Sequence, residues 1–351
     1  MPNEKQIEQR VRSSWRTRAC AAGLCVGAQI YLSGCAVGMP LALGSAWLSS
    51  LPALAFALWI CRCSCLGLAQ QRKTRTLYTL LAVTLLLCGA FALVSLAIFA
   101  AGTLVEQASR AWTQLLALLA CLLCALSGST GAARLGFAMR YALPVLVLGL
   151  SLANVPFQIP VGLFPILGAG AMQTGLASLA MLFGAAPALM LMLQPPEIAG
   201  AGERAQQCPI PPVRFFAVRV LLGAAAGIAL LFLTCSSATY ESIAESGEWS
   251  ARLRMAAGNQ PHEGIGQMLL ITAKLFAMLL LAVNMICAGQ QALMLAFPSL
   301  ARASLWPALL LPGAALAAEV LLGDTPILLA APAIAVPAAL SAALAGRRQK
   351  P

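Results

Sequence analysis

The sequence predicts an all-α integral membrane protein with about ten transmembrane helices, arranged as a 5+5 inverted repeat in which helices 1 and 6 are broken. Three observations lead to this fold class. The 351 residues are 60% hydrophobic and only 9% charged, whereas a soluble domain is roughly 45–50% apolar and about 25% charged. Apolar segments of roughly 20 residues, the length that crosses a bilayer, recur along the chain. Glycine and proline interrupt the first and the sixth of these segments.

The elements follow one another with mostly short loops. A cytoplasmic N-terminal tail, 1–18, precedes a single transmembrane domain, 19–346, and has no clear cleavage site that would make it a signal peptide. Repeat one covers about 19–155 and repeat two about 169–346, with an extracytoplasmic loop at 237–263. The predicted spans are 19–43, 46–69, 76–103, 112–129, 132–155, 169–194, 213–236, 264–294, 303–322 and 325–346.

The basic residues predict the orientation. If both termini are cytoplasmic, 18 of the 22 Lys and Arg residues lie on the cytoplasmic side, three lie outside (Arg110, Arg252 and Arg254), and Lys274 remains within a span. Cytoplasmic loops carry such an excess of positive charge. We therefore expect a multi-pass protein of the cell membrane with an even number of spans. Because the basic residues lie between apolar segments, we expect no nucleic-acid binding.

The interruptions fall at matching depths in the two repeats. The first span contains YLSGCAVGMP (31–40) and the sixth contains LFGAAPAL (182–189). At about 1.5 Å per residue, Gly34 and Gly184 both lie near the middle of the membrane. Matched interruptions of this kind are typical of inverted-repeat transporters, whose substrates bind at the midplane. In a second interpretation, these glycines and prolines only permit close helix packing.

One lysine stands inside an apolar span. Lys274 occurs in MLLITAKLFAMLLLAVNMICAG (268–289), which places it roughly 15 Å into a bilayer core of about 30 Å. Such a charge is costly and usually has a partner in the protein interior. No Asp or Glu lies at mid-depth in a predicted span. The partner is then a set of backbone carbonyls freed at a helix break or the carboxylate of a bound amino acid. Alternatively, Lys274 packs against carbonyls with no ligand.

Other polar residues in the spans carry weaker signals, which interhelical hydrogen bonds explain; they are Gln29, Tyr31, Ser33, Asn284, Gln290 and Gln291. No metal site, cofactor or catalytic group is expected. The single histidine, His262, is in a polar loop, and the cysteines at 61, 63 and 65 have no His or carboxylate near them in sequence. An enzyme is the function class that the sequence favours least.

Two stretches resemble a known family. LFPILGAGAMQTGLASLAMLFGAAPALMLMLQP (163–195) is similar to the sixth-span region of spore germination receptor B subunits, which belong to the amino acid–polyamine–organocation permease superfamily. GCAVGMPLALGSAWLSSL (34–51) resembles the end of their first span and the start of their second, and Lys274 resembles a lysine common in their eighth. The matching positions of the sixth-span region are Pro165, Gly168, Gly170, Phe183, Gly184 and Pro195. Ala185 departs from the family, which often has glutamate after the Phe-Gly pair.

The resemblance implies a germinant receptor subunit in the inner membrane of a spore. Such a subunit would bind a small amino acid or similar nutrient and would work with a larger membrane subunit and a lipoprotein. Two alternatives stay open: an amino acid permease with the same site, and a structural subunit with a vestigial cavity. The candidate ligand-binding residues, between spans one, six and eight, are Ser33, Gly34, Cys35, Gly38, Phe183, Gly184 and Lys274.

Overall fold

The computed structural model describes residues 4–69, 74–103, 110–126, 128–153, 170–195, 198, 210–237, 265–299, 310, 313–314 and 325–347, and every regular element among them is helical. The first repeat contains α1 (Glu4–Ser33), η1 (Gly34–Gly38), α2 (Met39–Ala42), η2 (Leu43–Ser45), α3 (Ala46–Ser49), α4 (Leu51–Ala69), α5 (Arg75–Thr103), α6 (Arg110–Ala125), α7 (Gly128–Ala138) and α8 (Ala142–Ala153). The second contains α9 (Ala171–Met181), η4 (Leu182–Met192), α12 (Val213–Ser237), α15 (Ile265–Ala296) and α17 (Thr325–Gly346).

The helices have the length and composition of membrane spans. Six segments in the described residues can cross a membrane, a bent pair (Leu115–Leu123 with Gly128–Ala138) adds a further candidate, and two shorter apolar helices cover 142–152 and 333–346. A chain in hydrocarbon must satisfy its backbone hydrogen bonds internally, and a helix does so within one segment. The all-α membrane fold class is therefore confirmed. The ninth predicted span, 303–322, and the predicted loop, 237–263, lie almost entirely outside the described residues.

The fifth predicted span, 132–155, is two helices rather than one. The helix α7 meets its predecessor at 97°, and a turn at Met139–Tyr141 separates it from α8. Pro144 explains the interruption, because proline has no N–H to donate to the carbonyl of Arg140 and its ring crowds that carbonyl. The turn places Arg140, which is half-buried, between the two helices.

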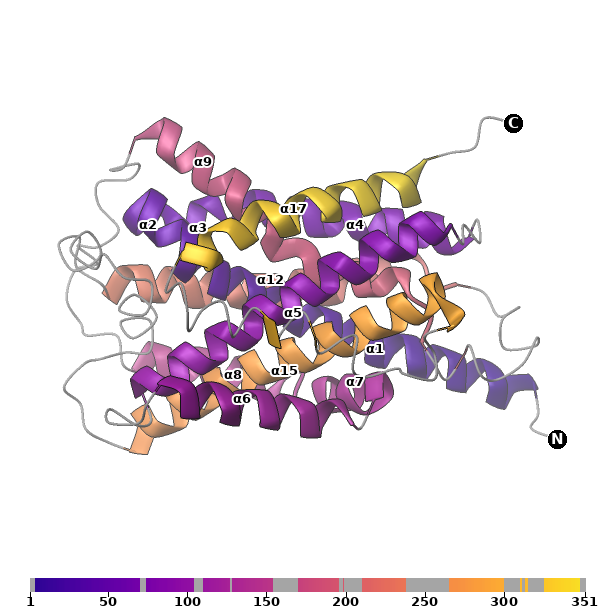
Figure 1. Cartoon of the computed structure of the whole chain (residues 1–351), viewed down its shortest axis with the longest axis horizontal. Helices are drawn as coiled ribbons and strands as arrows, with labels where there is room; N and C mark the ends of the chain where they lie inside the picture. The colour runs from indigo at the N-terminus through magenta and orange to yellow at the C-terminus, as the bar shows by residue number, and fades with distance from the viewer. Residues whose placement is uncertain are drawn as a thin grey trace.

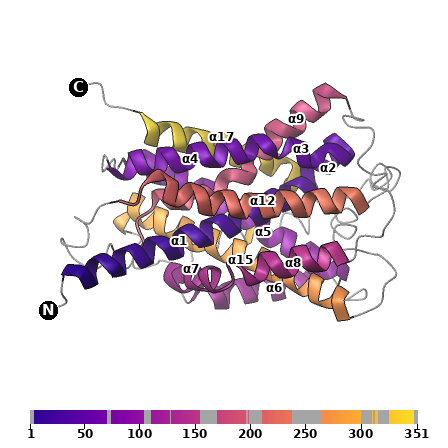
Figure 2. The ribbon, with the colours of Figure 1, turned by 180° about the vertical axis from the view of Figure 1, so that it is seen from behind.

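The described helices pack as two groups. One contains α1, α4, η4 and α12, and the other is centred on the long pair α5 and α15, with α6 and α7 beside it. Figure 1 shows the start of α1 and the end of α17 at the same end of the molecule, and Figure 2 shows α12 lying along α1. Residues 4–18 continue directly into the first span, and Val11, Trp15 and Arg18 are buried.

The helices α1 and α12 come into backbone contact through four glycines, Gly23, Gly27, Gly223 and Gly227, which we call the glycine seam. A Cβ atom on Gly27 would lie 2.2 Å from the carbonyl oxygen of Gly223, and one on Gly223 would lie 1.8 Å from that of Gly23. Both helices thus carry a glycine pair four residues apart, which lets two membrane helices approach to backbone contact. The seam fixes the position of α1 in its group.

Candidate functional site at the helix breaks and Lys274

The first predicted break is a change of helix type. Residues Gly34–Gly38 form a π-helical turn that continues α1, and the N–H of Met39 donates to the carbonyl of Gly34. After α2 the chain turns at Leu43, whose φ of 52° is rare for a residue with a side chain. Single π-helical turns within α-helices are frequent at functional sites. The interruption therefore spans 34–43 and begins at the glycine that the sequence indicated.

The second break is also a change of helix type. The α-helix α9 ends at Met181, and the next eleven residues, Leu182–Met192, form the 3₁₀-helix η4 with Pro187 inside it. Runs of 3₁₀-helix longer than three or four residues are uncommon and mark hinges or strained sequence. Helices 1 and 6 are thus both interrupted at the predicted glycines.

The two breaks lie against each other. A Cβ atom on Gly184 would lie 3.2 Å from Ser33 Oγ, and one on Gly38 would lie 2.8 Å from Met181 Sδ. Phe183 is fully buried and packs edge-to-face on Phe91 with 5.3 Å between ring centroids. Four predicted site residues, Ser33, Gly38, Phe183 and Gly184, therefore come from one contact region. Gly34 instead faces Leu231 of α12, where an added Cβ would lie 2.3 Å from a methyl carbon.

Lys274 is buried in the interior, as the sequence predicts. It lies nine residues after the start of α15, and only 5% of its side chain is exposed. Its Nζ lies 5.5 Å from the centroid of the Tyr31 ring, which places the ammonium by an aromatic face. Cys35, one turn after Tyr31 on α1, is near the ammonium. Lys274 on α15 therefore meets α1 at Tyr31 and Cys35, beside the first break.

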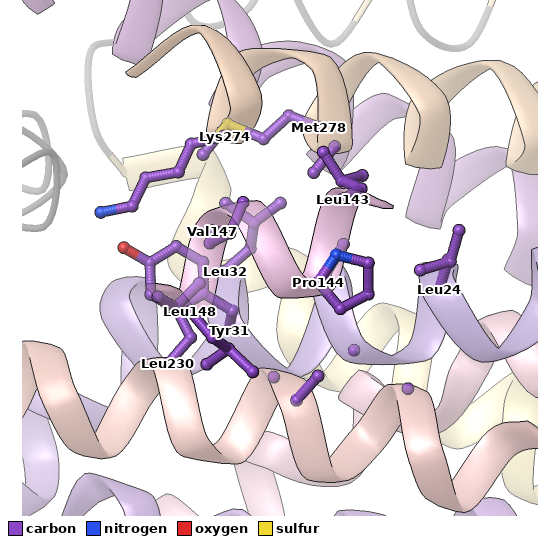
Figure 3. Close-up of a pocket in the computed structure, with 16 residues that line it drawn as sticks. Leu24, Tyr31, Leu32, Leu143, Pro144, Val147, Leu148, Leu230, Lys274 and Met278 are labelled. Atoms are coloured by element: carbon purple, nitrogen blue, oxygen red, sulfur yellow. The ribbon is translucent and has the colours of Figure 1, made fainter. Parts of the chain in front are cut away.

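A partly open cavity of about 70 Å³ lies at this meeting point, lined by α1, α8, α12 and α15. Tyr31 and Lys274 are the polar side chains among its lining residues, and leucine, valine, alanine, methionine, proline and glycine supply the rest. Figure 3 shows the Lys274 nitrogen and the Tyr31 hydroxyl at the same end of the group, with Leu24 at the other. Of the seven predicted site residues, Lys274 lines this cavity, and the other six lie outside its wall.

Gln29 is a polar residue whose importance the sequence did not reveal. Its side chain is fully buried, and neither its Nε2 nor its Oε1 has a hydrogen-bond partner among the described residues. Ser33 is one helical turn further along α1, so the two side chains share the face that packs on Gly184. Buried amides almost always have partners, supplied by protein, water or a ligand. Gln29 thus marks a polar position on the η4 side of α1, opposite the cavity at Lys274.

A buried arginine ties three segments together at the end of the molecule where α1 begins. Arg18 Nε donates to the Met190 carbonyl at 3.0 Å, Nη1 to the Gln194 carbonyl at 3.2 Å, and Nη2 to Gln291 Oε1 at 2.8 Å. Gln291 Nε2 also donates to the Gln194 carbonyl, at 2.7 Å. We call this set of hydrogen bonds the Arg18 clamp. It links α1 and the end of η4 to α15, in the other helix group.

The fold and this site define a multi-pass membrane protein with the architecture of inverted-repeat transporters, and solved structures agree. The structure is similar to that of a mutant manganese transporter from Eremococcus coleocola (TM-score 0.57, 14% identity, 95% of this chain and 76% of that one). It is equally similar to MHP1, a nucleobase-cation-symport-1 family transporter in a closed conformation with bromovinylhydantoin bound (TM-score 0.57, 14% identity, 93% and 77%). The manganese transporter in complex with an aromatic bis-isothiourea substituted compound gives a TM-score of 0.54 at 14% identity, over 95% and 76%.

Neither a protein-family model nor a curated protein sequence matches the chain. At 14% identity, the structural similarity shows the fold and leaves the substrate open. The solved structures confirm the predicted membrane fold, which is shared with transporters. The resemblance to the permease superfamily and to its germination receptor subunits stays a prediction.

Proposed function

We propose that this protein is a secondary transporter for a small organic solute that carries a carboxylate, such as a small amino acid, and that the carboxylate binds to Lys274. The observation that carries the proposal is the buried ammonium of Lys274 at the wall of an apolar cavity beside the first helix break. A cationic group at this depth attracts the carboxylate of any solute that reaches the cavity. A ligand carboxylate would form a charge-assisted hydrogen bond there, which is the stronger kind.

The cavity limits the size and the character of the solute. Its volume of about 70 Å³ is several times the roughly 10–15 Å³ that a single water needs by the same kind of measure, but it is small for a drug-sized ligand. The Tyr31 hydroxyl and the Lys274 ammonium form one polar end, and the remaining wall suits a short aliphatic group. These dimensions support a solute of the size of alanine.

The position of the cavity also supports transport. Tyr31 is on α1, in the helix group that contains both breaks, whereas Lys274 is on α15, in the other group. A solute held between them would favour the arrangement in which the groups are close, and this is how ligands shift conformational equilibria. The π-helical turn and the 3₁₀-helix at the breaks would serve as the hinges.

The test is uptake of labelled L-alanine and other small amino acids into proteoliposomes that contain the full chain. Lys274→Met keeps an unbranched side chain, one atom shorter, and removes its charge. We expect this change to lower uptake roughly 10- to 100-fold, the loss of one charge-assisted hydrogen bond. Met278→Leu is the matched control, because Met278 lies one turn later on α15 and lines the same cavity. We expect its uptake to stay near that of the parent.

Two results would count against the proposal. Uptake by Lys274→Met at the parental rate would show that the ammonium has no role in solute binding. An equal loss in Met278→Leu would show that the cavity responds to any change in packing and would leave no special role for Lys274.

A second candidate function rests on the sequence resemblance at 34–51 and 163–195. In this proposal the protein is a germinant receptor subunit of a spore inner membrane, which binds a nutrient at the same site and signals to partner subunits. Ala185, where the family often has glutamate, removes a carboxylate that proton or cation coupling would use. The proteoliposome experiment separates the two functions: a sensor would bind the amino acid, seen as thermal stabilisation, without any uptake.

A further inference from the structure

An arginine cluster lies at the end of the molecule where α1 begins. Its members are Arg12 and Arg16 of α1, Arg140 in the turn between α7 and α8, and Arg219 of α12. They line two adjoining cavities of about 300 and 330 Å³, and both cavities include Arg16 and Arg219. The positive-inside pattern predicts this end to be cytoplasmic. None of the four arginines lines the cavity at Lys274, although that cavity and the first of these two share Leu24, Pro144 and Gly223. No step of the proposed transport uses the cluster.

Aromatic rings hold three of the guanidinium groups in place. The Arg140 guanidinium lies 3.9 Å from the centroid of Phe137 and that of Arg16 lies 5.8 Å from the same ring, while the Arg219 group lies 3.8 Å from Phe215. Arg140 and Arg219 each also donate one hydrogen bond to a backbone carbonyl, that of Phe137 and that of Phe215. A guanidinium has five N–H donors, so several remain on each arginine after these contacts.

The N–H donors that remain on these arginines can bind an anion. Arg140 Nε is buried and has no hydrogen-bond partner among the described residues. No ion pair joins an arginine of the cluster to a carboxylate within the described part of the chain. Four like charges around shared cavities repel one another, and a phosphate relieves this by accepting hydrogen bonds from several guanidinium groups at once.

The outer wall of the first cavity is apolar and exposed. Val145 is 70% exposed, Leu222 61% and Val218 53%, and all three line the cavity that contains Arg16, Arg140 and Arg219. In a membrane protein, apolar side chains exposed at the level of a span face lipid tails. The cavity therefore has arginines on one side and a lipid-facing apolar strip on the other, formed by Val145 of α8 with Val218 and Leu222 of α12.

We propose that the arginine cluster binds the headgroup of an anionic phospholipid, with the phosphate between Arg16, Arg140 and Arg219 and an acyl chain along Val145, Val218 and Leu222. Basic pockets between membrane helices on the cytoplasmic side recognise lipid headgroups in this way. A free phosphate has the same anionic chemistry, but it would not use the apolar strip. A zwitterionic lipid would bring a cationic group to a cluster that is already positive.

Native mass spectrometry of the full-length protein in detergent tests the proposal, with titrations of phosphatidylglycerol and phosphatidylcholine. We expect the parent to retain phosphatidylglycerol and to prefer it at least about fivefold, and Arg16→Gln to lower that preference about fivefold. Arg16 is exposed and makes no hydrogen bond among the described residues, so this variant should fold. Arg140→Gln should lower the preference further. The matched control is Arg75→Gln, because Arg75 is exposed and also stacks on a phenyl ring, that of Phe297 at 4.4 Å, outside the cluster.

Three outcomes would overturn the proposal. An equal loss of preference in Arg16→Gln and Arg75→Gln would show that surface charge in general attracts the lipid. Displacement of phosphatidylglycerol by an equal concentration of glycerol 3-phosphate or inorganic phosphate would assign the cluster to a free anion. Failure of the parent to distinguish the two lipids would also refute it.

Discussion

Single residues differ in how far the sequence alone reveals their role. Lys274 could be predicted to be buried, because a lysine ten residues inside an apolar segment has no route to water, and the structure leaves it 5% exposed. Gln29 could not be assessed in this way. Whether a buried amide finds a partner depends on atoms from other helices, and its two unsatisfied atoms emerge only from the folded chain.

Gln29 allows a test in which stability and function move in opposite directions. Replacing Gln29 with leucine removes two buried polar atoms without partners in the described residues. Such a change is expected to stabilise the protein by about 1–3 kcal/mol, measured as a rise in Tm in detergent. If the Gln29 amide contacts solute or water during transport, L-alanine uptake falls in the same variant. A lower Tm of the leucine variant would show that the Gln29 amide has hydrogen-bond partners in the folded protein.

Asn284→Leu is the matched control, with the opposite sign. The Asn284 Nδ2 donates to the Leu280 carbonyl at 2.8 Å and to the Ala132 carbonyl at 3.4 Å. The leucine variant loses both bonds and leaves the Ala132 carbonyl with one donor fewer. We expect the free energy of unfolding to fall by roughly 1 kcal/mol, seen as a lower Tm.

At the scale of elements, local signals predicted where helices change but not how. Gly34, Gly184 and Pro187 indicated the two breaks, because glycine and proline act on the backbone wherever they occur. The π-helical turn and the long 3₁₀-helix depend on packing of the two breaks against each other, which no local pattern encodes. The glycine seam had a local signal, because α1 and α12 each contain two glycines four residues apart. That these two glycine pairs contact each other is seen only in the folded structure.

The glycine seam gives a sharp prediction for glycine-to-alanine changes. In Gly27→Ala the new Cβ would lie 2.2 Å from a backbone oxygen, so α1 and α12 must separate. We expect a loss of at least about 1–3 kcal/mol, the usual cost of overpacking, seen as a lower Tm and a lower yield of folded protein. Gly175→Ala in α9 is the control, because nothing lies within 4 Å of its added Cβ. That change should be neutral or stabilising by up to about 1 kcal/mol, since alanine favours a helix. Equal effects of the two changes would contradict close contact at the seam.

At the scale of the whole molecule, the contacts between the two helix groups lay beyond prediction. The partners of Arg18 are 172, 176 and 273 residues away along the chain, and a positive-inside count treats Arg18 as one more cytoplasmic charge. In the structure it connects α1 and the end of η4 to α15. These segments belong to the two helix groups that would move relative to each other in the proposed transport.

The Arg18 clamp therefore predicts how one end of the molecule opens. In Arg18→Gln the three hydrogen bonds of the guanidinium are lost, and bonds to charged groups contribute roughly 1.5–3 kcal/mol each. Amide hydrogen exchange should rise at least about tenfold at 189–194 and near Gln291, because local opening there needs less free energy. Exchange around Lys274, away from the clamp, should change little. Arg75→Gln is again the control, since Arg75 lies on α5 and takes no part in the clamp. Unchanged exchange in Arg18→Gln would mean that packing alone holds the groups together, whereas a uniform rise along the chain would mean that Arg18 supports the whole fold rather than one gate.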